Sequence, residues 1–349
     1  MNETICTEYF AGCNTGKGFI NYLPFALEGV DRVFILKGSP GSGKSSMMKK
    51  IASEAESSGI GVERIFCSSD PNSLDGIIMR EVSAAVIDGT APHTAEANYP
   101  GAVETIINLG EFWDSEMLRS HRDEIMTLSK RKSEHFTEAY LLLSASDKLR
   151  TARNNAVLRA VKKEKMEAAV GRLFSKVAKK GSGTFSYRLA SAFGTSGLRI
   201  LDTFKNASDF YYFSDKYGIS SLFISELLKL AAKNDVSVIV SPDPFDTAVP
   251  AAVCFTDTRT VFLSSNCSYF KESANVINTE RFIDKSEIAS CREKIKFLQK
   301  CVYSVNAAAA EALGKAKEAH MNMEQIYSLA MDFSEIDSLV EILSSEIFF

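Results

Sequence analysis

The sequence of 349 residues is poor in several residue types that mark specialised proteins. It has one tryptophan, four histidines and eight prolines, and its apolar runs stay well below the roughly 18 residues of a membrane span. Residues 1–6 show neither the basic nor the apolar region of a signal peptide. We therefore expect a cytoplasmic protein without a membrane span.

The cysteines give no sign of a disulfide framework or of a zinc site. Their number, seven, is odd, and no two of them have C-x-x-C spacing. They are Cys6, Cys13, Cys67, Cys254, Cys267, Cys291 and Cys301. The four histidines are not spaced as metal ligands either, so the sequence is typical of a reducing compartment.

The overall composition is that of an ordinary globular protein. Hydrophobic residues make up 45% and charged residues 24% of the chain. The length is sufficient for two domains with cores of their own. The net charge of −4 argues against binding of a polyanion by the chain as a whole.

One motif carries clear chemistry, the phosphate-binding P-loop G-x-x-x-x-G-K-S at residues 38–45. An apolar strand precedes it at 33–36, and a helix follows from Ser46 onward. In such a loop the backbone amides surround the phosphates, the lysine reaches the β- and γ-phosphates, and the serine binds Mg²⁺. The residues expected to bind ATP are Gly38, Ser39, Pro40, Gly41, Ser42, Gly43, Lys44, Ser45, Ser46 and Lys17.

The sequence is also internally duplicated. Residues 107–114 are echoed by 277–284, residues 69–71 by 242–244, and residues 34–37 by 213–216. The P-loop has no counterpart, because residues 217–221 (YGISS) stand in its place. The repeat predicts two copies of one fold, of which only the first can hold a triphosphate in the P-loop manner.

Each copy is predicted to be an α/β unit with a parallel sheet flanked by helices. Strands expected at 62–67 and 84–87 have counterparts at 236–240 and 260–263. We expect each copy to end in a long helical hairpin, at about 115–180 and 285–349, because each stretch is too long for one globular helix. The predicted domains are 1–180 and 181–349, with a linker at 181–184.

The two helical stretches differ in charge. Residues 148–180 hold eleven basic and two acidic side chains, and residues 311–349 hold eight acidic and two basic ones. Complementary charge favours docking of the two stretches on each other. Alternatively, the basic stretch binds nucleic acid or an acidic protein partner.

Further residues are candidates for the chemistry at the nucleotide. Asp88 follows the apolar strand 84–87 and is a Walker-B-like ligand for Mg²⁺, together with Ser45. Asp70, at the end of another strand, is a candidate base or water-positioning residue, and Asp75 follows it closely. His93 is a second candidate for orienting water. Arginine fingers in the same chain would be Arg80, Arg119 or Arg122.

Four segments carry a resemblance: GCNTGKGF (12–19), FILKGSPGSGKS (34–45), CSSDPNSLD (67–75) and DGTAPH (88–93). In combination the chain resembles an uncharacterised bacterial family of duplicated P-loop ATPase-like proteins, over essentially its whole length. The resemblance implies ATP binding and a tandem fold but supplies no substrate. In that family the second copy often carries a P-loop as well, and this chain departs from the pattern there.

Other P-loop classes are disfavoured by missing motifs. The guanine-specificity motif N-K-x-D, the transporter signature L-S-G-G-Q and the Gly-rich loop of protein kinases do not occur, and Asp88 is followed by Gly89 rather than an acid. We expect a Mg²⁺-dependent ATPase that acts as a conformational switch, with Lys44, Asp88, Asp70 and His93 as catalytic candidates. The alternatives are a small-molecule or nucleoside kinase, with Asp70 or Asp75 facing the acceptor, and a non-catalytic nucleotide-gated scaffold.

Overall fold

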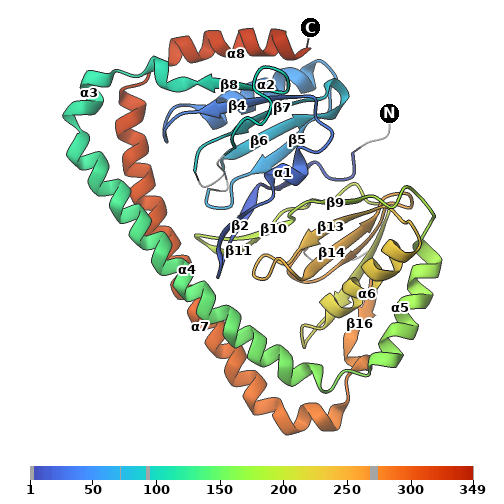
Figure 1. The fold of residues 1–349 in the computed structure, drawn as a ribbon. Helices are drawn as coiled ribbons and strands as arrows, with labels where there is room; N and C mark the ends of the chain where they lie inside the picture. Colours follow the sequence, from blue (N-terminus) through green and yellow to red (C-terminus); the bar gives the residue numbers. More distant parts are fainter. Residues whose placement is uncertain (1–3, 71, 92–94, 268–273, 349) are drawn as a thin grey trace.

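The computed structural model describes residues 4–70, 72–91, 95–267 and 274–348. Figure 1 shows two α/β units that are joined along one side by two long helices. Each unit has a six-stranded sheet, and a small two-stranded hairpin from each unit lies between them.

The first sheet is mixed rather than parallel. Across the sheet its strands are β1 (Glu8–Phe10), β5 (Glu63–Phe66), β6 (Leu74–Met79), β7 (Ala84–Asp88), β4 (Arg32–Lys37) and β8 (Glu104–Asn108). β4 is parallel to both of its neighbours, whereas β6 is antiparallel to β5 and to β7. The prediction of a fully parallel sheet was therefore wrong, because β6 was not anticipated.

The second sheet repeats the first strand for strand. Its order is β9 (Phe185–Tyr187), β13 (Val238–Pro242), β14 (Pro250–Phe255), β15 (Thr260–Leu263), β12 (Asp209–Ser214) and β16 (Asn275–Asn278). β14 is antiparallel to both neighbours, as β6 is. The hairpins are β2 (Gly12–Thr15) with β3 (Gly18–Asn21), and β10 (Ser191–Gly194) with β11 (Gly197–Ile200). The two halves thus share one topology, as the duplicated sequence predicts.

Helices follow the equivalent strands in both units. α2 (Lys44–Ser57) follows β4, and α6 (Ser220–Lys233) follows β12. The short elements are α1 (Leu23–Ala26), η1 (Arg80–Val82), η2 (Leu109–Phe112) and η3 (Thr279–Phe282).

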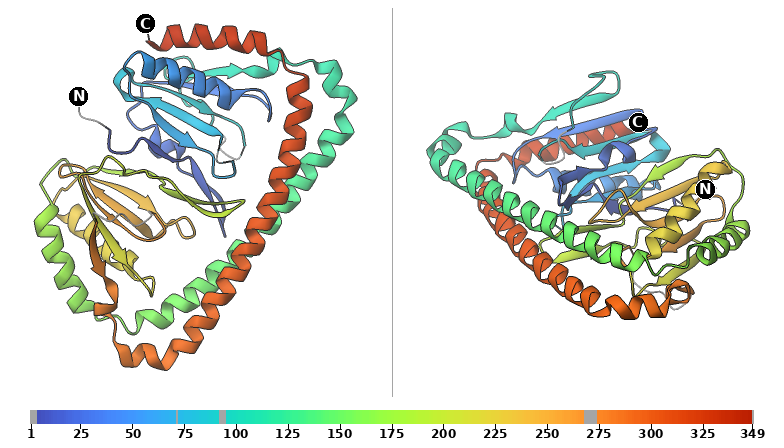
Figure 2. Two further views of the ribbon diagram at one scale, coloured as in Figure 1. Left: turned by 180° about the vertical axis from the view of Figure 1, so that it is seen from behind. Right: turned by 60° about the horizontal axis from the view of Figure 1, so that its bottom comes forward.

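The long helical stretches do not form the predicted hairpins. The first contains α3 (Ser115–Ser120), α4 (Arg122–Leu158) and α5 (Lys163–Val177), and the second contains α7 (Lys285–Leu329) and α8 (Phe333–Phe348). α4 and α7 run antiparallel along each other (Figures 1 and 2). Leu128 packs with Ile326 near one end, and the Ser146 hydroxyl donates to Asn306 Oδ1 at 2.6 Å farther along. Helical periodicity predicts an apolar face but not the partner that covers it.

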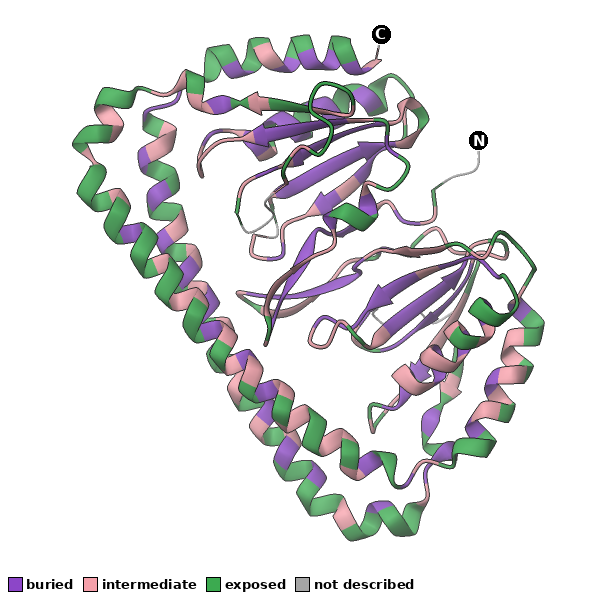
Figure 3. Cartoon of the chain, viewed as in Figure 1, coloured by how far each residue is buried: buried purple, intermediate pink, exposed green. Residues whose placement is uncertain are grey.

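The short helices after α4 and α7 cover the sheet of the opposite copy. α5 packs on α6 and the second sheet, while α8 packs on α2 and the first sheet. Ile336, Val340 and Leu343 of α8 are buried in one core with Phe34 and Met47. Because each such side chain contributes roughly 1.5–3 kcal/mol on burial, the C-terminal helix completes the core of the first unit. Figure 3 shows the buried side of α8 turned toward that unit.

The other faces of the two sheets share a core. Ile35 and Ile87 of the first sheet are buried in the same cluster as Ala252 and Leu263 of the second. The units are therefore connected by this apolar contact, by the pair α4–α7, by the exchanged helices α5 and α8, and by contacts between the two hairpins.

The predicted docking of the basic stretch on the acidic stretch was also wrong. Because α4 and α7 are antiparallel, the end of α4 lies beside the first half of α7 and not beside residues 311–349. Ion pairs from the basic stretch go to Asp243 (from Arg150, 3.1 Å), to Asp284 (from Lys162, 3.6 Å) and to Asp235 (from Lys180, 3.9 Å). Within the described ranges, no helix combines the length and apolar character needed to cross a membrane.

Candidate functional site

The connection between β4 and α2 contains two glycines in left-handed conformations. Gly41 and Gly43 have φ angles of +79° and +83°, a left-handed region that is costly for residues with a side chain. Gly43 directly precedes α2, and Lys44 is the first residue of that helix. The amides of the loop therefore gather at the positive end of the helix dipole, a place suited to an anion.

Lys44 is buried inside this loop rather than extended into solvent. Its ammonium donates to the carbonyl oxygens of Gly38 at 2.9 Å and of Ser39 at 2.8 Å, and the residue is 8% exposed. Burial lowers the pKa of the Lys44 ammonium below its ordinary value, and the nearby Asp88 carboxylate partly opposes that shift. A buried cation held by weak carbonyl acceptors is a good partner for an incoming anion.

Asp88 lies beside the loop because β7 pairs with β4, with Asp88 opposite Leu36. Its Oδ2 is 3.7 Å from Lys44 Nζ, while Oδ1 accepts hydrogen bonds from the Thr90 amide at 2.8 Å and the Thr90 hydroxyl at 2.5 Å. Burial raises the pKa of Asp88, and Lys44 and Thr90 act in the opposite direction. The structure thus brings Lys44 and Asp88 together as the sequence predicted.

Three serines of the loop region differ in their surroundings. Ser45 Oγ accepts a hydrogen bond from the Leu74 amide at 3.0 Å, whereas Ser46 is exposed. Ser39 Oγ is buried and has no hydrogen-bond partner among the described residues. A buried hydroxyl without a partner costs about 1–3 kcal/mol, so a polar ligand in the loop would relieve that cost.

The sequence favoured Asp70 over Asp75 as the catalytic candidate, whereas their surroundings in the structure favour Asp75. Asp70 lies at the side of the site, where its Oδ1 accepts from Lys317 Nζ of α7 at 3.1 Å. Asp75, in β6, is 4% exposed, and its charge acts on both Lys44 and Asp88. Asp75 is therefore a buried carboxylate near the loop, since the amide of the preceding Leu74 donates to Ser45 Oγ.

The last turns of α7 press directly on the P-loop. The Ser328 hydroxyl donates to the Gly41 carbonyl at 3.3 Å, and a Cβ on Gly41 would lie 2.4 Å from the Glu324 carbonyl oxygen. Phe333, at the start of α8, lies 3.4 Å from the position of a Cβ on Gly43. Helix α7, which spans both units, is thus in contact with the candidate phosphate-binding loop.

The remaining candidates lie elsewhere. Lys17 is exposed at the tip of the β2–β3 hairpin, next to Gly16, which packs on the Ser144 backbone of α4, and no described contact joins Lys17 to the loop. Arg80 is held by Glu63 at 3.0 Å, away from the loop. Arg119, in the last turn of α3, and Arg122, the first residue of α4, are exposed. His93 lies outside the described residues.

In the second unit a side chain fills the corresponding anion position. Asp215, between β12 and α6, accepts hydrogen bonds from the amides of Gly218 (3.0 Å), Ile219 (2.9 Å) and Ser220 (2.6 Å). The Thr279 hydroxyl donates to the same carboxylate at 3.0 Å. The helix N-terminus that would attract phosphate is therefore already neutralised by the chain itself.

Sequence reasoning missed Asp215 and the residues of α7. An aspartate a few residues before a helix is a recognisable capping signal, so Asp215 could have been found. Lys317, Glu324 and Ser328 follow one another at intervals of seven and four residues on α7, a spacing that places them on one side of the helix. Nothing in their spacing says that this side meets the P-loop.

Comparison of the chain with protein-family models, with curated proteins and with solved structures gave no match. Among the described residues there is also no cluster of three or more histidine, cysteine or carboxylate side chains that could hold a metal ion.

Proposed function

We propose that the chain binds Mg-ATP at the loop 38–45 and hydrolyses it, and that the first unit acts as a nucleotide-dependent switch. The observation that carries the proposal is the buried Lys44 ammonium, enclosed by a loop with two left-handed glycines and adjacent to Asp88. The residues also fit the ligand, since the Ser39 hydroxyl has no partner among the described residues and no side chain caps the start of α2.

The loop and the residues beside it would have distinct roles in the reaction. The loop amides and Lys44 hold the phosphates and stabilise negative charge that develops on the transferring phosphoryl group. Ser45 and Asp88 would hold Mg²⁺, which would supply Lewis-acid stabilisation of negative charge on the phosphates. Asp75 is buried and directly follows Leu74, whose amide donates to Ser45 Oγ, so we assign it to orient the attacking water.

The switch follows from the contacts of α7. Ser328 and Glu324 meet the backbone of Gly41, so a change in the loop on nucleotide binding would displace the end of α7. α7 continues along α4 to the second unit, and the second unit is therefore mechanically connected to the site.

A kinase would need an acceptor pocket beside Asp70, whereas hydrolysis needs only water. A large cavity lies beside Asp243, the counterpart of Asp70 in the second unit. The kinase and scaffold alternatives would be distinguished by turnover without an added acceptor.

Binding is tested by calorimetric titration of the full chain with a non-hydrolysable ATP analogue and Mg²⁺. We expect Lys44→Ala to weaken binding roughly 10- to 100-fold, because a charged hydrogen bond contributes about 1.5–3 kcal/mol. Lys49→Ala, an exposed lysine of the same helix, is the matched control and should bind as the parent does. Equal affinity of the parent and Lys44→Ala would contradict the proposal.

A further inference from the structure

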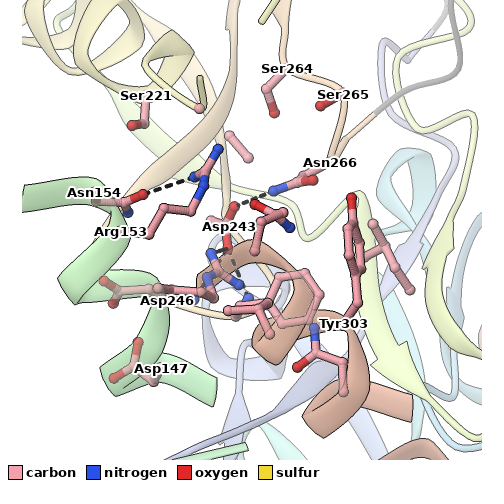
Figure 4. A pocket seen from close by; sticks show the side chains of 18 of the residues that line it. Asp147, Arg153, Asn154, Ser221, Asp243, Asp246, Ser264, Ser265, Asn266 and Tyr303 are labelled. Atoms are coloured by element: carbon pink, nitrogen blue, oxygen red, sulfur yellow. Dashed lines mark hydrogen bonds and ion pairs between the residues drawn. The ribbon is translucent and has the colours of Figure 1, made fainter. Parts of the chain in front are cut away.

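A large cavity lies in the second unit, between the carboxyl end of its sheet and the helices α4 and α7. Its volume is about 1220 Å³, which exceeds the roughly 300–1,000 Å³ of typical ligand sites. It includes the connection from β12 to α6 and is therefore the counterpart of the P-loop region in the first unit. Figure 4 shows side chains from α4, α7 and the second sheet directed into it.

The cavity cannot hold phosphate in the way that the first unit is proposed to. Asp215 already occupies the amides at the start of α6, and the second unit has no lysine that corresponds to Lys44. A ligand in the cavity must be held by side chains.

Arg153 of α4 is the principal side chain available for that purpose. Its Nη1 donates to Asn154 Oδ1 at 3.0 Å, and the same atom lies 2.9 Å from where a Cβ on Gly218 would be. Its guanidinium thus lies over the connection where the first unit has its P-loop. Arg153 Nε is buried and has no hydrogen-bond partner among the described residues. Such a half-buried, partly unsatisfied guanidinium is the geometry that a bidentate oxyanion would complete.

Two further groups support an anion beside Arg153. Ser264 Oγ is buried in the cavity wall without a described partner, at about the place where the first unit carries Asp88. Arg292 of α7 also lines the cavity. The replacement of an acid by a hydroxyl removes a repulsion that an anionic ligand would otherwise meet.

Two acidic groups of the wall, Asp215 and Asp243, are engaged with the protein itself, and Asp147, Asp246 and Glu311 also line the cavity. Asp243 binds Arg150 at 3.1 Å through one oxygen and Asn266 at 2.8 Å through the other. Arg150 is in turn stacked over Phe245, with 4.3 Å from its Cζ to the ring centroid. Figure 4 shows Arg153, Asn266 and Ser264 around the same space above this network.

We propose that the cavity binds a phosphorylated small molecule, with Arg153 and Ser264 as donors to its phosphate group. The cavity is large enough for a nucleotide. The ligand would touch α4 of the first copy as well as the second sheet, so its binding would be felt by both copies. The proposal does not depend on ATP binding at Lys44.

The test uses the full-length Lys44→Ala protein, in which the P-loop site is impaired. Calorimetric titrations with ADP, AMP and pyrophosphate supply phosphate ligands of three sizes, and citrate supplies carboxylates. We expect at least one phosphate probe to bind with one site per chain. Adding Arg153→Ala should weaken that binding at least 10-fold, whereas the exposed neighbour Lys148→Ala should leave it unchanged.

Three results would overturn the proposal. They are no binding of any phosphate probe to Lys44→Ala, binding of citrate alone, and phosphate binding that survives Arg153→Ala. Circular dichroism melting shows whether Arg153→Ala is folded. If it is not, Arg153→Lys and Ser264→Ala replace it, since both keep the volume of the cavity wall nearly unchanged, and each should still weaken binding.

Discussion

Three glycines with nearly equal φ angles allow the steric contact between α7 and the loop 38–45 to be measured as a loss of unfolding free energy. Gly41, Gly43 and Gly59 have φ angles of +79°, +83° and +80°. An added Cβ would meet nothing within 4 Å at Gly59, Phe333 at 3.4 Å at Gly43, and the Glu324 carbonyl oxygen at 2.4 Å at Gly41. The conformational cost of placing alanine in the left-handed region is therefore similar at the three positions, and only the surrounding atoms differ.

The magnitudes follow from these distances. A left-handed alanine costs about 1–2 kcal/mol, and the loss of unfolded-state entropy offsets roughly 0.4–1 kcal/mol of it. Gly59→Ala and Gly43→Ala should each lower the free energy of unfolding by about 1 kcal/mol. Gly41→Ala must also displace the backbone of α7, which adds about 1–3 kcal/mol as in overpacked cores.

Urea titration measures the loss of unfolding free energy in each of the three variants. The unfolding is followed by the fluorescence of Trp113 and by circular dichroism. Trp113 is the chain's one tryptophan, and its ring centroid lies 5.8 Å from that of Tyr327 at the end of α7. The fluorescence thus reports on the contact in question. Equal losses in all three variants would refute the inference that α7 presses on the loop.

Three other predictions concern single side chains. Burial and neighbouring lysines lower the pKa of His320 from 6.5 to about 4, so protonation favours the unfolded state. The free energy of unfolding should therefore fall by roughly 3 kcal/mol in all as the pH drops from 6.5 toward 4. His320→Gln should flatten this part of a profile of urea midpoint against pH. Asp215→Asn should cost about 1–2 kcal/mol in urea unfolding as a weakened helix cap, and the exposed Asp209→Asn, on the preceding strand, should cost nothing measurable. Asp88→Asn should reduce ATP turnover about 10- to 100-fold with less effect at high Mg²⁺, and a loss that excess Mg²⁺ leaves unchanged would contradict the metal-binding role.

The sequence predicted those parts of the fold that depend on local pattern. The strand, loop and helix around residues 33–52 are present as β4, the P-loop and α2, and the duplication is visible in the identical strand orders. β6 was missed because Asp75 and Gly76 interrupt its apolar run, and it makes the sheet mixed. The prediction of helical hairpins was wrong because the apolar face of one helix can be covered by the apolar face of any other helix.

The site was predictable to the same extent. Lys44, Ser45 and Asp88 follow from a motif and from the end of a neighbouring strand, and the register of β4 with β7 brings them together. Asp75, Glu324 and Ser328 come from segments whose approach depends on the tertiary fold. Asp215 carries a local signal, but its meaning appears only when three amides of α6 are seen to bind it.

The most direct test of the proposed function is Mg-ATP turnover by the purified chain, with phosphate release and ADP formation followed separately. The account predicts equal amounts of both products without an added acceptor, and loss of both in Lys44→Ala but not in Lys49→Ala. Turnover that persists in Lys44→Ala, or tight ATP binding by the parent with no turnover at all, would contradict an ATPase at this loop.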